Sequence, residues 1–171
     1  MTTTVKLVSK PQEIDQVRAL CRQWLDWHWE NYPADWPTDG NPMDRARFGS
    51  ILDSLNELHA RPDGGMFLAS LDGQPVGCVM YKKAGDGVAE FNRMFVNEAG
   101  RGHGIGRLLL DHMFEQMIKD GYHKVIFSSA VFLAHAKAMY EAAGFKSAPH
   151  PEGFPLEWKP YVYFMERLFT A

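Results

Sequence analysis

The chain has 171 residues, 46% of them apolar and 23% charged, and its net charge is −3. This composition is typical of a globular protein and excludes a disordered one. The length predicts a single domain over 1–171, and the mildly acidic balance excludes a general basic surface for nucleic acid. No apolar stretch approaches the roughly 18 residues of a membrane span or resembles a signal-peptide core, so we expect no membrane partner.

The chain contains two cysteines, Cys21 and Cys78, which are far apart in the sequence and stand in unrelated contexts. This usage predicts reduced thiols that serve as small buried apolar groups, and therefore a cytoplasmic protein. We expect no metal. The oligomeric state is left open between a monomer and a homodimer.

The first half of the chain predicts a strand, a pair of helices and a hairpin. Residues 3–8 alternate like a strand, and apolar residues recur at helical spacing over 12–29. Proline and glycine then enforce a loop, after which 43–59 predicts a second helix. The segments 66–71 and 76–81 are joined by the turn DGQP, which predicts a hairpin.

The second half predicts a β-α-β unit. A strand over 88–96, a helix over 103–120 and a strand over 124–128 follow one another, so these strands are expected to run parallel. The order β-α-α-β-β-β-α-β-α-β-β predicts one mixed sheet with helices on its faces. The remaining predicted elements are a helix over 133–143 and strands over 145–148 and 160–169.

The segment between strand 88–96 and the following helix reads RGHGIGR, from Arg101 to Arg107, with Gly102, Gly104 and Gly106 at alternate positions. Such glycines let the backbone approach a ligand and aim several N–H groups in one direction at the positive end of a helix. With the flanking arginines, the expected ligand is a phosphate or pyrophosphate. A purely structural interpretation, a tight strand-to-helix turn, remains open, although such a turn needs fewer glycines.

The spacing of these glycines limits which phosphate compounds the turn is expected to bind. It does not match G-x-x-x-x-G-K-[ST], which excludes a nucleoside triphosphate loop. It also differs from G-x-G-x-x-G, and no acidic residue ends the next strand, so nicotinamide binding is disfavoured.

Segment 101–106 resembles the R/Q-x-x-G-x-G/A signature of the GNAT superfamily of acyl-CoA-dependent N-acyltransferases. The later stretch HAKAMYEAAGF resembles the A-x-x-(L/M)-Y-x-x-x-G-F helix and turn of that family. The resemblance is specific over 88–146 and rests on element order elsewhere. It implies a GNAT-like α/β (α+β) domain with a central mixed, mostly antiparallel sheet of about seven strands flanked by about four helices. The matched positions of the second motif are Ala136, Met139, Tyr140, Gly144 and Phe145.

The resemblance also implies how acetyl-CoA would bind as cosubstrate. Backbone amides of the glycine turn would hold the pyrophosphate, and the pantetheine arm would pair with the preceding strand like an added strand. The strand residues could equally be plain sheet residues, because main-chain pairing hardly constrains side chains. The implied cofactor-binding residues are Met94, Phe95, Val96, Arg101, Gly102, His103, Gly104, Ile105, Gly106 and Arg107.

Two residues are candidates for proton transfer. Tyr140 matches the family tyrosine that protonates the departing thiolate; the alternative is a helix tyrosine with a buried ring. Glu90 stands where histone-type members carry a glutamate base; the alternatives are a solvated strand-end carboxylate and a base supplied by water. One departure concerns Leu133, because the family often has asparagine at that position, and a polar contact near the thiol is therefore missing.

The acceptor side is less specific. Residues 23–44 contain no Lys or Arg but several acids and aromatic residues, among them Trp29, Tyr32 and Trp36. Acidic groups beside aromatic faces would receive a cationic amine; alternatively the acids cap helices and solvate a loop. The resemblance implies an N-acetyltransferase that acts on a primary amine of a small molecule or peptide by direct attack in a ternary complex. A catalytically silent acyl-CoA-binding or regulatory module on the same fold is the alternative, and a nicotinamide oxidoreductase a remote third.

Overall fold

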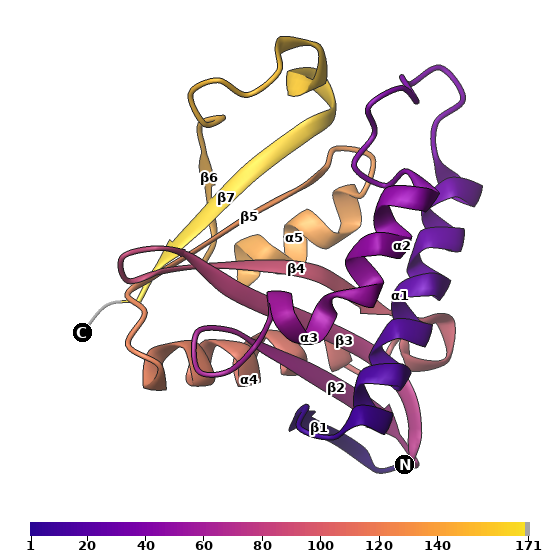
Figure 1. Ribbon diagram of the computed structural model, residues 1–171, viewed down its shortest axis with the longest axis vertical. Helices are drawn as coiled ribbons and strands as arrows, with labels where there is room; N and C mark the ends of the chain where they lie inside the picture. Colours follow the sequence, from indigo (N-terminus) through magenta and orange to yellow (C-terminus); the bar gives the residue numbers. More distant parts are fainter. Residues whose placement is uncertain (170–171) are drawn as a thin grey trace.

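The computed structural model describes residues 1–169, so the last two positions of the predicted domain lie outside the described residues (Figure 1). Strands and helices follow in nearly the predicted order. The strands are β1 (Thr3–Leu7), β2 (Gly65–Leu71), β3 (Gln74–Gly85), β4 (Val88–Val96), β5 (Lys124–Ala130), β6 (Lys146–Ala148) and β7 (Val162–Leu168). The α-helices are α1 (Pro11–Asn31), α2 (Arg45–Asp53), α3 (Leu55–Leu58), α4 (Ile105–Lys119) and α5 (Ala134–Ala142), and two 3-10 turns are η1 (Glu98–Gly100) and η2 (Leu156–Tyr161).

Within residues 1–169 the strands form one seven-stranded sheet of order β1-β2-β3-β4-β5-β7-β6. Neighbouring strands are antiparallel except β4 and β5, which are parallel, as the predicted β-α-β unit requires. The parallel pairing is short, since only Val88–Glu90 faces Lys124–Ile126. The two strands therefore separate beyond Glu90, in the middle of the sheet.

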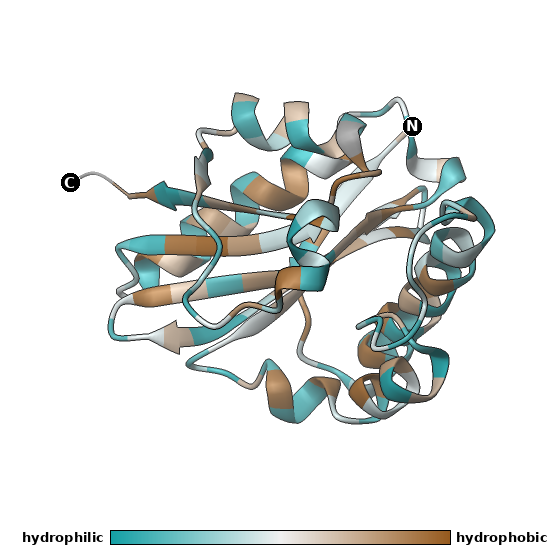
Figure 2. Cartoon of the chain, turned by 90° about the horizontal axis from the view of Figure 1, so that it is seen from above, coloured by the Kyte–Doolittle hydropathy of each residue, from teal (hydrophilic) through white to brown (hydrophobic). Residues whose placement is uncertain are grey.

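Helices cover both faces of the sheet (Figure 1). Alternation along β2 shows why: Met66 and Leu68 pack in the cluster that contains α1, α2 and α3, whereas Phe67 and Ala69 pack in the cluster that contains α4. The sheet lies between two layers of helices, and the hydropathy colours show apolar residues on the sides of the helices that face the strands (Figure 2). Both faces of the central strands are thus buried, which makes them a rigid base for a site.

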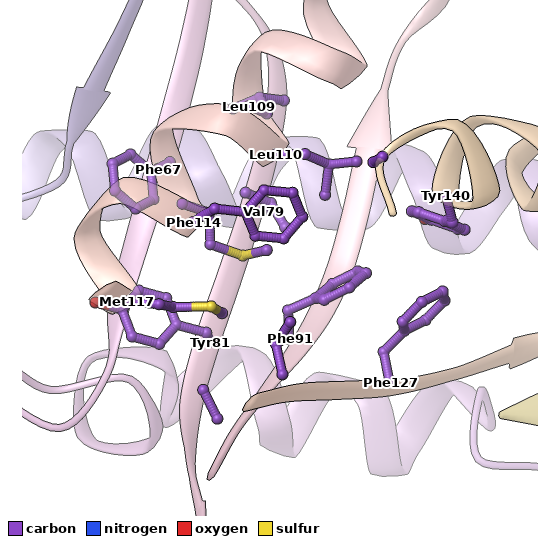
Figure 3. Packing of buried hydrophobic residues seen from close by; sticks show 14 of the residues in the cluster. Phe67, Val79, Tyr81, Phe91, Leu109, Leu110, Phe114, Met117, Phe127 and Tyr140 are labelled. Carbon is purple, nitrogen blue, oxygen red and sulfur yellow. The ribbon is translucent and has the colours of Figure 1, made fainter. Parts of the chain in front are cut away.

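Aromatic rings fill the core where β4, β5 and α5 meet (Figure 3). The ring of Phe127 lies 4.3 Å from that of Phe91 and 4.4 Å from that of Tyr140, measured between centroids. Phe145 adds an edge-on contact to Phe127 at 4.9 Å. These contacts hold the ring of Tyr140 between the sheet and α5, so its position is set by core packing.

Several predicted boundaries are wrong. The helix predicted over 43–59 is broken at Ser54 into α2 and α3, and Asp44 caps the start of α2. The strand predicted over 76–81 is longer, because Lys82 and Lys83 continue the ladder against β4. The predicted strand 160–169 begins only at Val162, because the residues before it form η2.

The two cysteines, predicted to stand in unrelated contexts, belong to one cluster. Cys21 of α1 and Cys78 of β3 are both fully buried there, and both are free thiols. The prediction of buried apolar thiols is confirmed. None of the helices within residues 1–169 has the length and apolar character needed to cross a bilayer.

Candidate functional site

The glycine turn lies between β4 and α4. Gly102 and Gly104 have φ of 80° and 70°, in the left-handed region that glycine adopts without strain. An added Cβ at either position would meet no protein atom within 4 Å. The first turn of α4 closes with the bond from the Leu108 amide to the Gly104 carbonyl (3.1 Å), so the preceding amides lie outside the helical ladder. These amides and the positive end of the helix are suited to bind an anion.

Gly106 serves a different purpose from the other two glycines. It lies inside α4, where an added Cβ would be 2.9 Å from Met139 Sδ and 3.3 Å from Met94 Cε. The missing side chain therefore lets α4 approach α5 and β4 closely. Sequence reasoning assigned the same role to all three glycines, and the structure separates a turn requirement from a packing requirement.

A cleft of about 580 Å³ opens where β4 and β5 separate. Arg93 lies at the start of this opening: it is a non-glycine residue at φ 51°, beside a register shift between β3 and β4. Beyond it, the edge of β4 that faces β5 has no ladder partner in the described pairing. All the predicted cofactor-binding residues line this cleft except His103, whose exposed ring contacts the Arg101 carbonyl (3.0 Å). Those lining residues are Met94, Phe95, Val96, Arg101, Gly102, Gly104, Ile105, Gly106 and Arg107.

Coenzyme A fits this chemistry. The turn offers backbone donors for a pyrophosphate, and the free edge of β4 offers main-chain groups for an amide-containing arm. Arg101 and Arg107 flank the turn; the guanidinium of Arg101 lies 5.9 Å above the ring of Trp27, and that of Arg107 donates to Asp111 at 3.0 Å. Both arginines are exposed, so they remain accessible to a phosphate.

Tyr140 lines the cleft from α5 and is 5% exposed. Burial, assisted by the nearby Tyr163, raises the pKa of its hydroxyl above the ordinary value. The hydroxyl therefore keeps its proton at neutral pH and can donate it. Its fixed ring and its position on the cleft wall suit a general acid.

Glu90 does not line the cleft. It lies in the paired half of β4, where its Oε1 is 3.8 Å from Lys82 Nζ, and its side chain is 32% exposed. Its link to the cleft is Asn92, whose Nδ2 donates to Glu90 Oε1 at 3.2 Å. Asn92 lines the cleft, and its buried Oδ1 has no hydrogen-bond partner among the described residues. The bond to the Glu90 carboxylate fixes which side of the Asn92 amide carries the oxygen. The Asn92 Oδ1 is therefore a hydrogen-bond acceptor that no described residue uses.

A second cavity of about 530 Å³ lies next to the cleft. It is enclosed by the C-terminal part of α1, by the loop that follows α1, and by η2. The two hollows share the lining residues Trp24, Ser128, Ser129 and Leu133, so they meet where the end of β5 faces the C-terminal half of α1. Leu133 precedes α5 without a side-chain cap, which leaves an apolar side chain at the junction in place of the family's asparagine. Two reactants that entered from opposite sides would meet there.

Of the predicted acceptor residues, Tyr32 and Trp36 line the second cavity, and Trp29 lines neither. Trp29 instead supports the loop, since its Nε1 donates to the Met43 carbonyl at 2.8 Å. The acids of residues 23–44 are likewise absent from both linings. Asp26 pairs with Arg45 at 2.9 Å, and Asp44 caps α2. The expectation that these acids receive a cationic amine is therefore not supported.

His28 of α1 lines the second cavity, although the sequence assigned it no functional role. It is 4% exposed, and neither ring nitrogen has a hydrogen-bond partner among the described residues. Burial lowers its pKa to about 4, so the imidazole is neutral at pH 7. Neither His28 nor Asn92 carries a sequence signal, because a lone polar residue in a helix or strand does not reveal a buried, unpaired environment.

Among residues 1–169 there is no group of three or more His, Cys, Asp or Glu side chains that could hold a metal ion. The site consists of backbone amides, a buried tyrosine, an asparagine–glutamate pair and an aromatic cavity. This set suits transfer between two organic substrates that bind side by side.

Comparisons with known proteins point to acetyltransferases. Residues 21–145 match the model of the acetyltransferase (GNAT) family. The chain is 32% identical to the IAA acetyltransferase of Azospirillum brasilense over 109 residues, which cover 63% of this chain and 70% of that protein. It is 30% identical to the N-acetylaspartate synthetase of Danio rerio over 104 residues, which cover 60% of this chain and only 37% of that protein.

Solved structures show the same fold. A GNAT-family acetyltransferase from Staphylococcus aureus Mu50 superposes with a TM-score of 0.75 at 16% identity, over 99% of this chain and 100% of that chain. The PaiA N-acetyltransferase of Thermoplasma acidophilum, in complex with coenzyme A, superposes with a TM-score of 0.69 at 16% identity, over 99% and 100% of the two chains. The predicted mixed, mostly antiparallel sheet flanked by helices is thereby confirmed.

Proposed function

The chain belongs to the acetyltransferase (GNAT) family, and from this premise we propose that it transfers an acetyl group from acetyl-CoA to a primary amine of a small molecule or peptide. The amine attacks directly while both substrates are bound. One observation carries this proposal: the cleft below the glycine turn and the second cavity meet at Trp24, Ser128, Ser129 and Leu133. That junction is where a thioester and an amine would react.

Acetyl-CoA supplies an activated thioester, and the chain supplies its binding site. The amides around Gly104 bind the pyrophosphate, and the open edge of β4 pairs with the pantetheine arm. Arg101 and Arg107 add charge at the rim. The strain-free left-handed glycines and the empty space around them support this assignment.

Tyr140 acts as the general acid. Its hydroxyl keeps its proton at neutral pH because burial raises its pKa. It can therefore deliver that proton to the thiolate as the C–S bond breaks. Packing against Phe91 and Phe127 fixes the ring, which limits the motion needed for the transfer.

Glu90 acts as the base through Asn92. The free Oδ1 of Asn92 accepts a hydrogen bond from the amine or from a water that carries its proton, and Glu90 accepts the proton through that water. Glu90 is partly exposed, so the proton returns to solvent. His103 of the glycine turn and His135 of α5 are not required by this scheme.

An acyl-enzyme on cysteine is disfavoured. Cys21 and Cys78 are fully buried in the cluster on the α1 side of the sheet, and neither lines the cleft or the second cavity. Because both thiols are free, we place the reaction in the reducing environment of the cytoplasm.

The proposal is tested by the release of free coenzyme A thiol from acetyl-CoA, followed over separate pools of aromatic amines, polyamines, amino acids and peptides. We expect amine-dependent release with one pool and saturation in both substrates. Tight binding of coenzyme A without release in any pool would indicate a silent binding module instead. Release at the same rate without an amine would indicate a thioester hydrolase.

A further inference from the structure

The walls of the second cavity define the class of amine, an inference that rests on the proposed function. Aromatic rings from the loop after α1 and from η2 enclose the cavity: Trp36 lies 4.8 Å from Tyr161 and 5.8 Å from Tyr32, measured between ring centroids. Trp158 adds a further ring, 6.0 Å from Tyr161. A cavity of about 530 Å³ with such walls suits one small ligand with a flat apolar body.

Charged groups are scarce in this cavity. Among the described lining residues, only Arg47 and Glu157 carry a charge, and both are exposed. None of the acids of residues 23–44 lines the cavity, and Asp26 of α1 pairs with Arg45 instead. A polyamine or aminoglycoside would bring several ammonium groups among rings that offer few carboxylates, and each group would lose water without a partner. The cavity therefore favours a molecule with one amine.

His28 adds a specific polar requirement. Its ring lies 5.3 Å from those of Trp29, Tyr32 and Phe132, and it faces the cavity with both nitrogens unpaired among the described residues. A neutral imidazole offers one donor and one acceptor. A buried polar group of this kind favours a ligand that completes its hydrogen bonds and rejects one that leaves it unpaired.

We propose that the acceptor is a small aromatic monoamine that carries a neutral hydroxyl or ring N–H group. Its ring packs against the wall that Trp36 and Tyr161 form together, its polar group bonds to His28, and its amine reaches the junction beside Trp24. The amine nitrogen forms a bond to the acetyl carbon as the C–S bond breaks. The sulfur keeps the electron pair of that bond and takes up a proton, while the nitrogen loses one proton. No oxidant or further reactant is needed.

Tyramine and phenethylamine test this inference, because they differ only in the phenolic hydroxyl. For the wild-type chain we expect kcat/KM for tyramine to exceed that for phenethylamine roughly tenfold or more, and spermidine to be the poorest of these acceptors. His28→Phe should reduce the preference for tyramine to about twofold or less, since the buried hydrogen-bonding partner is lost. His112→Phe is the matched control: His112 lies on α4, lines neither cavity, and should leave the ratio unchanged.

Separate measurements distinguish a failure of this inference from a failure of the proposed function. Acetyl-CoA affinity is measured by calorimetry, and a chain that does not bind acetyl-CoA refutes the proposed function itself. If acetyl-CoA binds but spermidine is the best acceptor, or if tyramine and phenethylamine react equally, only the aromatic-monoamine inference is wrong. If His28→Phe does not fold, His28→Gln replaces it. The glutamine side chain can still form a hydrogen bond, so a partly retained preference of this variant for tyramine over phenethylamine supports the inference. Absence of both turnover and tyramine binding to the coenzyme A complex overturns it.

Discussion

Gly104→Ala offers the sharpest test of the cofactor site. Gly104 has a φ of 70°, and an added Cβ would meet no protein atom within 4 Å. The substitution therefore adds no collision within the protein, but it makes the left-handed backbone unfavourable by about 1 kcal/mol. A backbone that relaxes from this conformation turns the amides at the start of α4 away from their common direction. If those amides bind the pyrophosphate, affinity for acetyl-CoA must fall.

The size of the effect follows from the number of bonds lost. Hydrogen bonds to a charged group contribute about 1.5–3 kcal/mol each, so the loss of one such bond raises Kd roughly tenfold to a hundredfold. The folded chain itself loses only about 1 kcal/mol, which corresponds to a fall in Tm of about 2–4 °C for a domain of this size. Binding and stability should thus change by clearly different amounts.

Gly121→Ala is the matched control. Gly121 follows the other end of α4, has a φ of 94°, and also has no protein atom within 4 Å of an added Cβ. It lies outside the lining of the cleft, so its substitution should lower Tm by a similar amount and leave Kd for acetyl-CoA within about twofold of wild type. Isothermal titration calorimetry and thermal unfolding measure both quantities. Equal Kd values for wild type, Gly104→Ala and Gly121→Ala would refute the assignment of the turn to the pyrophosphate.

Four further substitutions test the proton transfers and the fold. Tyr140→Phe should lower kcat about tenfold or more and leave Kd for acetyl-CoA nearly unchanged; an unaffected kcat in steady-state assays would remove Tyr140 from the mechanism. Glu90→Gln should lower kcat/KM most at low pH, and part of this deficit should disappear at high pH, where the amine is already neutral. Asn92→Leu should cause the same loss of kcat/KM. If the pH profiles of both variants superpose on that of the wild type, water alone is the base. Glu13→Gln should destabilise the chain by about 1–3 kcal/mol at pH 7, because hydrogen bonds from Lys6 and from backbone amides lower the pKa of Glu13 from 4.5 to about 2. This contribution is present above pH 4.5 and is lost as the pH falls toward 2. In urea unfolding, the free energies of unfolding of the wild type and of Glu13→Gln should therefore converge over that range. A difference between the two that stays constant with pH would contradict an ionic origin of the stabilisation.

The parts of the site that could be predicted from the sequence are those set by local backbone requirements. Glycines at alternate positions predict a tight turn with free amides at the start of a helix, and the motif around Tyr140 predicts the helix that carries it. Most strands were predicted for a similar reason, since alternation and turn residues are local. The break at Ser54 and the late start of β7 were missed because neither has a strong local signal.

The parts that could not be predicted depend on contacts between distant segments. The acids of residues 23–44 look like an amine site in the sequence, yet the fold engages Asp26 with Arg45 and leaves the cavity aromatic. His28 belongs to the cavity only because the loop after α1 and η2 close over it. Asn92 gains its free acceptor only because Glu90 holds the other side of its amide. Such roles follow from burial and partner choice, which a single sequence does not show.

The bulge beside the opening between β4 and β5 is held by buried contacts on the α1 side of the sheet. Arg93 sits at φ 51°, a left-handed conformation that costs energy for a residue with a side chain. Its guanidinium donates to His59 Nε2 and to Met80 Sδ at 3.1 Å, while His59 Nδ1 donates to the Tyr81 carbonyl at 2.8 Å. Burial and the arginine lower the pKa of His59 to about 4, so the imidazole is neutral and its Nε2 accepts the arginine's bond. These buried contacts therefore hold the bulge whose strand edge faces the cleft, and the geometry of the cleft is coupled to His59 and Met80, which do not line it.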